Sequence, residues 1–176
     1  MDGWNLVGGL WYYYENKKPV INVWRKDSHG KWFYLGNTGA MLTNSWQKDT
    51  SERWFYVGAD GQMVTNVWKQ DSSSKWFYLG NDGAVASNCF RQDSSLRWFY
   101  CNELGEMVTK EWRRDSNNLW FYLGDDGAVA LSQWIHWTDG KQYYCGANGA
   151  MYFSTVTPDG YTVDASGAWD GSPQQT

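Results

Sequence analysis

Long apolar runs and clustered basic residues are both missing from this sequence of 176 residues. No stretch approaches the roughly 18 consecutive apolar residues that a membrane-spanning helix requires, and the opening residues Met-Asp-Gly-Trp do not resemble a signal peptide. Because 15 basic residues face 19 acidic ones, the net charge is −4, which argues against binding to the phosphate backbone of a nucleic acid. We therefore expect neither membrane insertion nor a nucleic-acid partner. The charge is compatible with a cationic or neutral ligand.

Cysteine and histidine are too few to suggest metal binding or catalysis. The three cysteines and two histidines show no metal-ligand spacing. There is also no Ser/His/Asp set, no Cys/His pair and no recurring pair of carboxylates. Cys101 and Cys145 occupy a slot that Leu35 fills elsewhere, so we interpret them as small apolar core residues. A Cys89–Cys101 bridge across one hairpin is the alternative. The sequence predicts no catalytic residue, no metal and no cofactor.

Aliphatic residues are sparse, so one large core of Leu, Ile and Val is not expected. Aromatic residues are abundant instead, with 14 Trp, 12 Tyr and 7 Phe. Tryptophan recurs on a 22-residue period, with Phe90 holding one slot of the first series. A second series follows eight residues after the first, and Gln142 is its first exception. The two series indicate one structural unit copied in tandem; they are Trp24, Trp46, Trp68, Trp112 and Trp134, and Trp32, Trp54, Trp76, Trp98 and Trp120.

One repeat, residues 24–45, predicts a β-hairpin. Its segment WFYL favours a strand, and the polar run KDSHGK before it is typical of a hairpin loop. Asp27 is interpreted as the residue that starts the loop turn, because its side chain accepts backbone N–H groups two residues on. Gly39 is expected to supply a positive φ in the following turn. Asn44 is expected to take left-handed geometry before the next hairpin.

Alternation along WFYL places Trp32 and Tyr34 on one face of the strand and Phe33 and Leu35 on the other. Both faces are apolar, and an isolated hairpin is marginally stable in water, so successive hairpins must stack. We predict an all-β chain: a superhelical solenoid of stacked β-hairpins of about 22 residues, with no α-helix.

The ends of the chain depart from the repeat. We expect a single repeat module over residues 1–171 with about seven hairpin units, a degenerate unit from about 155, and a disordered tail over residues 172–176. Because the repeats begin within four residues of the start, the sequence is expected to be a fragment of a longer protein or a product with its own start site.

Two Trp held on one hairpin and an aromatic residue from the next would form a three-sided cage. Such a cage suits a quaternary ammonium ion, which the ring quadrupoles attract without any hydrogen bond. Methionine recurs two residues after the turn glycine and could form the floor of the cage. Three rings and some methyl burial would contribute roughly 3–5 kcal/mol, a dissociation constant on the order of millimolar. Several such sites would bind a polymer strongly through effective concentration. The methionines are Met41, Met63, Met107 and Met151, with Val85 and Val129 in the same slot.

These units, of the form W-x₇-W-[FY]-Y-L-G-x-[DN]-G-x-[MV]-x-[TS]-N, resemble the choline-binding, or cell-wall-binding, repeats of Gram-positive bacteria and their phages. The resemblance covers residues 4–171. It implies a superhelical stack of hairpins with choline held between consecutive hairpins by two aromatics of one, one of the next and often a Met. The implied partner is choline or phosphocholine on teichoic or lipoteichoic acid, and the implied location is the extracellular bacterial cell surface. Catalytic or effector domains of such proteins lie elsewhere in the polypeptide.

Carried over by position, the resemblance implies six choline-binding cages. Which ring of the following WFY segment closes each cage stays open, and Trp54 or its equivalents are the alternative. The cages are Trp24 and Trp32 with Tyr56 and Met41; Trp46 and Trp54 with Tyr78 and Met63; Trp68 and Trp76 with Tyr100; Phe90 and Trp98 with Tyr122 and Met107; Trp112 and Trp120 with Tyr144; and Trp4 and Trp11 with Tyr34.

The sequence also departs from the family pattern. The paired Trp are eight apart where the family more often has seven, Val85 and Val129 replace Met, and Gln142 removes a wall. We expect the cages lacking Met, and the one that uses Phe90, to be weaker. The cage after Trp134 is expected to be absent, so that the binding array ends there. Phe33, Phe55, Phe77, Phe99 and Phe121 are expected to be core residues.

Two other functions remain open at this stage. Aromatic platforms also stack on sugars, so a glucan-binding repeat module is the main alternative; it should need polar side chains beside the platform, and none recurs in register apart from turn residues. The other alternative is a purely structural surface stalk, in which every aromatic ring is a core residue. A homodimer through the C-terminal unit is a further expectation.

Overall fold

A computed structural model describes residues 2–175, and within them every regular element is a β-strand. The chain divides into two compact units, residues 1–86 and 87–176. No helix in the described part of the chain is long and apolar enough to cross a membrane. The prediction of an all-β chain built from hairpins is confirmed.

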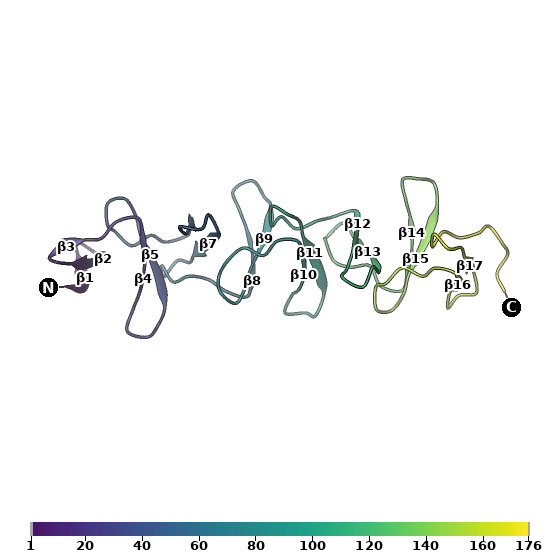
Figure 1. Ribbon diagram of the computed structural model, residues 1–176, viewed down its shortest axis with the longest axis horizontal. Coiled ribbons are helices and arrows are strands. Elements are labelled where there is room, and N and C mark those ends of the chain that lie inside the picture. Colours follow the sequence, from purple (N-terminus) through teal and green to yellow (C-terminus); the bar gives the residue numbers. More distant parts are fainter. Residues whose placement is uncertain (1, 176) are drawn as a thin grey trace. The chain divides into compact units, whose positions relative to one another are not determined.

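The first unit consists of four hairpins, each made of two antiparallel strands (Figure 1). A short third strand extends the first of them. In the next hairpin Trp24 lies opposite Tyr34 and Lys26 opposite Trp32. The strands are β1 (Gly3–Val7), β2 (Leu10–Glu15), β3 (Lys18–Pro19), β4 (Val23–Lys26), β5 (Trp32–Leu35), β6 (Ser45–Lys48), β7 (Trp54–Val57), β8 (Val67–Gln70) and β9 (Trp76–Leu79).

The second unit continues the same pattern and ends in a hairpin of two-residue strands. Residues 89 and 101 lie opposite each other in its first hairpin, and both cysteines there are free thiols. The strands are β10 (Cys89–Gln92), β11 (Trp98–Cys101), β12 (Glu111–Arg114), β13 (Trp120–Leu123), β14 (Gln133–His136), β15 (Gln142–Cys145), β16 (Thr155–Val156) and β17 (Thr162–Val163).

The turns follow the sequence prediction. The side chain of Asp27 accepts the N–H groups of His29 and Lys31 at 2.9 and 2.8 Å. Gly39 has φ +84° and Asn44 has φ +46°. The carbonyl of Gly58 accepts the N–H of Asn44 at 2.9 Å, which extends the pairing of the β6–β7 hairpin by one residue beyond its strands. The aspartate contacts recur at Asp49, Asp71, Asp93 and Asp115, so the loops of the hairpins from β4–β5 to β12–β13 begin in the same way.

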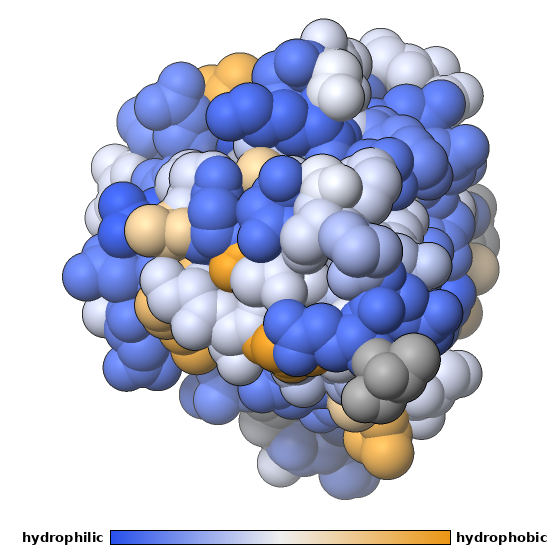
Figure 2. Space-filling model, turned by 90° about the vertical axis from the view of Figure 1, so that its right-hand side faces the viewer, coloured by the Kyte–Doolittle hydropathy of each residue, from blue (hydrophilic) through white to orange (hydrophobic). Residues whose placement is uncertain are grey.

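Within each unit, the most deeply buried side chains are aliphatic residues and cysteines at the end of the second strand of successive hairpins. Leu35 and Val57 are fully buried in the first unit, and Cys101 and Cys145 are fully buried in the second, which confirms their predicted core role. The face shown in Figure 2 is mainly hydrophilic, with apolar residues in small separate patches. Aromatic side chains therefore supply the remaining contacts between hairpins.

Candidate functional site

An aromatic pair marks one face of every hairpin before the last, β16–β17. In the β4–β5 hairpin, Trp24 and Tyr34 are cross-strand partners, and their ring centroids lie 5.2 Å apart with the planes at 69°. Edge-to-face contacts of this kind are favourable beyond the area that they bury. The pair recurs as Trp4–Tyr13, Trp46–Tyr56, Trp68–Tyr78, Phe90–Tyr100, Trp112–Tyr122 and Trp134–Tyr144.

A ring from the following hairpin then packs on the same tryptophan. Phe55 of β7 lies 5.5 Å from Trp24, with the planes at 63°. Phe55 is 5% exposed, so it is a core residue as predicted and also a wall of the cavity described next. The contact recurs as Trp4–Phe33, Trp46–Phe77, Phe90–Phe121, Trp112–Tyr143 and Trp134–Tyr161.

Four apolar side chains from consecutive repeats line a small open cavity. Trp24, Trp32, Phe55 and Met63 border a space of about 200 Å³ together with the charged residues Asp49, Arg53 and Asp82. The carbonyl of Trp32 accepts the N–H of Met63 at 2.8 Å, which fixes the methionine beside the indole. The same backbone bond joins Met41 to Trp11, Val85 to Trp54, Val129 to Trp98 and Met151 to Trp120.

The methionine is held from its other side by the turn glycine of the next repeat. A Cβ atom on Gly83 would lie 2.7 Å from the Sδ atom of Met63, and Gly83 has φ +83°. The glycine is thus required both by backbone geometry and by the space that the thioether occupies.

The two tryptophan series differ in exposure. Indoles of the first series are half-buried, whereas Trp32, Trp54 and Trp98 are 38%, 46% and 48% exposed. The exposed indoles make cation–π contacts with lysine side chains of the same hairpin. Lys26 Nζ lies 4.8 Å from the ring centroid of Trp32, and Lys48 Nζ lies 5.0 Å from that of Trp54. The second series therefore presents the accessible ring faces of each cavity.

The structure groups the predicted residues differently from the sequence. Tyr56 was grouped with Trp24 and Trp32, but it faces Trp46 on its own hairpin, 5.1 Å away. Met41 was also assigned to that cage, but it lines the preceding cavity with Trp4 and Trp11. Adjacent strand residues point to opposite faces, so the phenylalanine next to each tyrosine reaches the previous hairpin instead. Every predicted tyrosine pairs with the first aromatic of its own hairpin: Tyr34, Tyr56, Tyr78, Tyr100, Tyr122 and Tyr144.

The N-terminal cavity, of about 440 Å³, is closed by Phe33 and Met41, where the sequence assigned Tyr34 to Trp4 and Trp11. Around the next pair of tryptophans, Phe77 packs on Trp46 and the N–H of Val85 donates to the carbonyl of Trp54, where the sequence assigned Tyr78 and Met63. Trp68 and Trp76 belong to the first unit and Tyr100 to the second, so their grouping stays a prediction.

A cavity of about 540 Å³ lies beside Phe90 in the second unit, lined also by Trp98, Phe121 and Val129. Phe90 stands in the slot of Trp24, and Val129 stands in the slot of Met63. Met107, which the sequence placed in this cage, lies against Gly127 instead.

Trp137 is a ring that sequence reasoning did not assign. It stands 22 residues after Asp115, where earlier repeats have the turn aspartate. Its ring lies 6.4 Å from that of Trp112 and 5.7 Å from that of Tyr122. The aspartate period could have revealed it, because position 137 is the first slot in which that series fails.

After Trp134 the structure contains a cavity where the sequence predicted none. Trp134, Gln142, Asp159, Tyr161 and Trp169 line a space of about 400 Å³. The N–H of Trp169 donates to the carbonyl of Gln142 at 2.9 Å, the same bond that Met63 makes to Trp32. An indole in the methionine slot thus offsets the indole lost at position 142, so a cavity remains although the paired tryptophan is missing. The absence of a choline cage after Trp134 stays a prediction.

Carboxylates stand beside the rings. Asp27 and Asp49 line the first two cavities, and Asp115 lines the one beside Phe90. The hydrogen bond from the N–H of Lys31 lowers the pKa of Asp27, and the bond from Leu119 does the same for Asp115. These groups are therefore negatively charged at neutral pH and favour a cation nearby.

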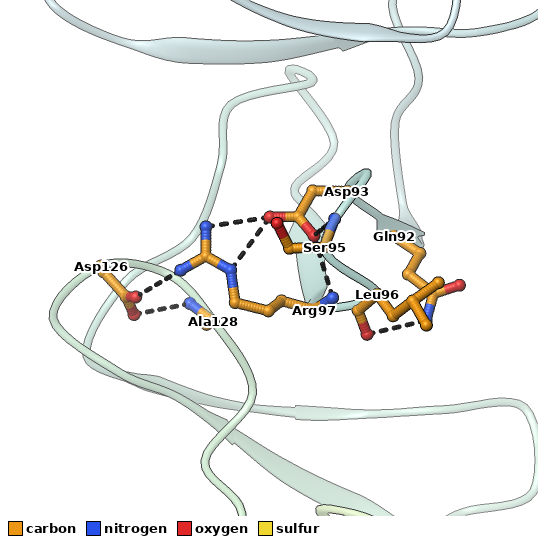
Figure 3. Close-up of polar contacts among 7 residues, drawn as sticks. All are labelled: Gln92, Asp93, Ser95, Leu96, Arg97, Asp126 and Ala128. Carbon is orange, nitrogen blue, oxygen red and sulfur yellow. Dashed lines mark hydrogen bonds and ion pairs between the residues drawn. The ribbon is translucent and has the colours of Figure 1, made fainter.

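Arginine links a hairpin loop to the turn of the following repeat (Figure 3). The guanidinium of Arg97 contacts Asp93 of its own loop at 2.9 Å and Asp126 at 3.1 Å. Arg53 makes the equivalent contacts to Asp49 and Asp82 at 2.8 and 3.3 Å and lines the Trp24 cavity. These pairs are solvent-exposed, so they orient the loops more than they stabilise them.

Within residues 2–175 no group of three or more His, Cys, Asp or Glu is placed to hold a metal ion. The recurring chemistry of the described chain is therefore that of aromatic rings, thioethers and single carboxylates.

Comparison with known families and structures agrees with this geometry. A model described as a choline-binding repeat matches residues 128–169, and a cell wall binding repeat model matches residues 23–41, 44–63, 67–85 and 110–129. No curated protein sequence matches the chain.

Among solved structures, the choline-binding domain of CbpL from Streptococcus pneumoniae is 29% identical, with a TM-score of 0.65, over 98% of this chain and 99% of that one. Choline binding protein F of the same species is 32% identical, with a TM-score of 0.60, over 96% of this chain and 57% of that one. CbpJ from S. pneumoniae TIGR4 is 28% identical, with a TM-score of 0.62, over 96% and 58%.

Proposed function

Because the chain belongs to the family of choline-binding, cell wall binding repeats, we propose that it anchors to the cell wall by holding choline in aromatic cages. The cavity of Trp24, Trp32, Phe55 and Met63 carries this proposal. The ring faces and the thioether require no hydrogen bond from a ligand, which suits a trimethylammonium group. Asp49 and Asp82 share the single guanidinium of Arg53 beside the cavity, so the charged lining keeps one negative charge in excess.

The proposed ligand is choline, or phosphocholine displayed on teichoic or lipoteichoic acid at the bacterial surface. Each cage would bind it with a dissociation constant on the order of millimolar, since each partly exposed cation–π contact contributes about 0.5–1 kcal/mol. The repeated cages of one chain would then hold a polymer through effective concentration. In this proposal the module is extracellular and not catalytic, and any catalytic or effector domain lies elsewhere in a longer polypeptide.

A titration that separates charge from shape tests the proposal. Choline and its neutral isostere 3,3-dimethylbutan-1-ol are each added to the protein, and tryptophan fluorescence is followed. We expect saturation by choline at millimolar concentration and a response at least tenfold weaker with the neutral alcohol, because the alcohol lacks the cation–π term. Equal responses, or none, would contradict choline binding.

Retention on a choline-bearing resin tests the multivalent part. Trp32→Ala removes one wall of one cage, and we expect elution at a lower choline concentration but not loss of retention, because the other cages still act together. Leu96→Ala, which changes an exposed loop residue, is the matched control and should elute with the unaltered protein. Complete loss of retention together with unfolding would favour a purely structural role for the rings.

A further inference from the structure

The cavity at the C-terminal end differs in chemistry from the others. Its walls are Trp134, Tyr161 and Trp169, but its remaining lining is polar, with Gln142 and Asp159. We propose that this cavity is a sugar-binding site, which takes a pyranose ring of a glycan chain and not a trimethylammonium group.

Three rings form the apolar part of this site. The ring of Tyr161 lies 6.0 Å from both Trp134 and Trp169, with interplanar angles of 83° and 87°. Trp169 is 37% exposed, so solvent and ligands can reach it. A pyranose has an apolar face of C–H groups that packs on such a ring, while its hydroxyls project from the edge and require polar partners.

Gln142 supplies the first polar partner. It occupies the slot of the exposed indole, 22 residues after Trp120. Its amide offers two donors and an acceptor, and within residues 2–175 its side chain makes no hydrogen bond to the protein. A trimethylammonium group would cover this amide without satisfying it, whereas a hydroxyl can both donate to it and accept from it.

Asp159 supplies the second polar partner for a sugar hydroxyl. Its two carboxylate oxygens accept hydrogen bonds from Thr157 Oγ1 at 2.5 Å and from Trp134 Nε1 at 2.8 Å. Partial burial opposes the charge, but these two bonds outweigh it and lower the pKa of Asp159. Each oxygen retains a further lone pair that can accept a sugar hydroxyl.

The C-terminal residues hold the walls in place. Trp169 Nε1 donates to the carbonyl of Ser172 at 3.1 Å, and Gln174 Nε2 donates to the carbonyl of Asp159 at 2.8 Å. The backbone N–H of Gln175 donates to the carbonyl of Gly160 at 2.7 Å. These bonds fix Trp169 and the turn that carries Asp159, so the site is preorganised before any ligand binds.

Indole N–H signals in ¹H–¹⁵N spectra of the full chain, assigned by single Trp→Phe variants, test the proposal. The probes are tetra-N-acetylchitotetraose, isomaltotetraose and choline. We expect at least one saccharide to shift the signals of Trp134 and Trp169 and to leave that of Trp32 unchanged. Saturating choline, added beforehand, should not prevent these saccharide-induced shifts. Choline shifting Trp134 and Trp169 while neither saccharide does would overturn the proposal.

Two variants of Gln142 and one control variant sharpen the result. Gln142→Ala should weaken saccharide binding roughly tenfold, while Gln70→Ala, in a hairpin of the first unit, should leave it unchanged. Gln142→Trp should restore an indole wall, so that choline now shifts Trp134 and the saccharide no longer does. Saccharide binding that is equal in the Gln142→Ala and unaltered proteins would also overturn the proposal. The response of Trp32 to choline is recorded in the same spectra, so failure of the choline cages is detected separately.

Discussion

In the six hairpins from β4–β5 to β14–β15, the second-last residue of the loop has a positive φ, although glycine occupies only two of these six positions. Gly30 and Gly140 have φ +78° and +80°, but Leu96 holds the equivalent position at +63° with its side chain 73% exposed. A left-handed conformation costs an L-residue about 1–2 kcal/mol. The loop therefore stores strain that packing does not offset at this exposed leucine.

Replacing Leu96 by glycine should stabilise the protein. Glycine removes the Cβ clash of the left-handed conformation, which stabilises the folded chain. It also increases the conformational entropy of the unfolded chain, which costs roughly 0.5–1 kcal/mol of stability. We therefore expect the free energy of unfolding to rise by about 0.5–1 kcal/mol, because the relief of strain is the larger of the two effects. Urea denaturation followed by tryptophan fluorescence measures the change. Leu96→Ala keeps the Cβ atom and should show no gain. A lower stability for the glycine variant would mean that the leucine side chain makes a contribution that its exposure hides.

At the scale of the element, the hairpin decides which rings share a cavity. Phe55 and Tyr56 are neighbours on β7, yet Phe55 packs on Trp24 of the preceding hairpin and Tyr56 on Trp46 of its own. Alternation along the strand places the two side chains on opposite faces, but it does not determine which face contacts the previous hairpin. Either Phe55 or Tyr56 could therefore be expected to pack on Trp24.

Leucine substitutions at these two neighbours distinguish the groupings. Phe55→Leu should weaken choline binding at the Trp32 indole by roughly two- to fivefold, because one cation–π contact of about 0.5–1 kcal/mol is lost. Tyr56→Leu should affect the Trp54 indole instead. Both side chains are buried, at 5% and 7% exposure, so the pair is matched for its cost to the core. Indole signals in a choline titration give the answer, and the reverse pattern would support the grouping predicted from the sequence.

At the scale of the whole chain, the loop aspartates link stability to pH. The N–H of Lys31 lowers the pKa of Asp27 below its ordinary value of 3.8, and that of Leu119 does the same for Asp115. A carboxyl whose pKa is lower in the folded than in the unfolded chain stabilises the fold above 3.8, and the contribution is lost as the pH falls through the folded value. The loop of nearly every repeat thus adds the same acid sensitivity.

We expect the thermal unfolding midpoint to be level between about pH 5 and 7 with respect to these groups, and to fall steadily below about pH 4. Circular dichroism in the aromatic region follows the transition. Asp115→Asn keeps an acceptor for the Leu119 N–H but cannot be protonated in this range, so the midpoint should fall less steeply. An unchanged slope would mean that other carboxyl groups carry the acid response.

Much of this protein was determined by its sequence alone. The 22-residue period, the hairpins, the loop Asp, the turn Gly39 and the buried slot of Leu35 all follow from contacts within one repeat, where backbone geometry and residue preference suffice. The presence of tryptophan and methionine around the Trp24 cavity was also predictable, because these residue types recur in most repeats.

Only the tertiary structure decided which members of the repeat meet. Phe55 and Met63, and not Tyr56 and Met41, face Trp24 and Trp32. Trp169 rebuilds the cavity that Gln142 was expected to remove. These contacts join residues of successive hairpins, and they depend on how one hairpin lies on the next within a unit. Because the repeats have similar sequences, the sequence pattern is compatible with several ways of packing one hairpin on the next. The packing of the folded chain determines which of them occurs.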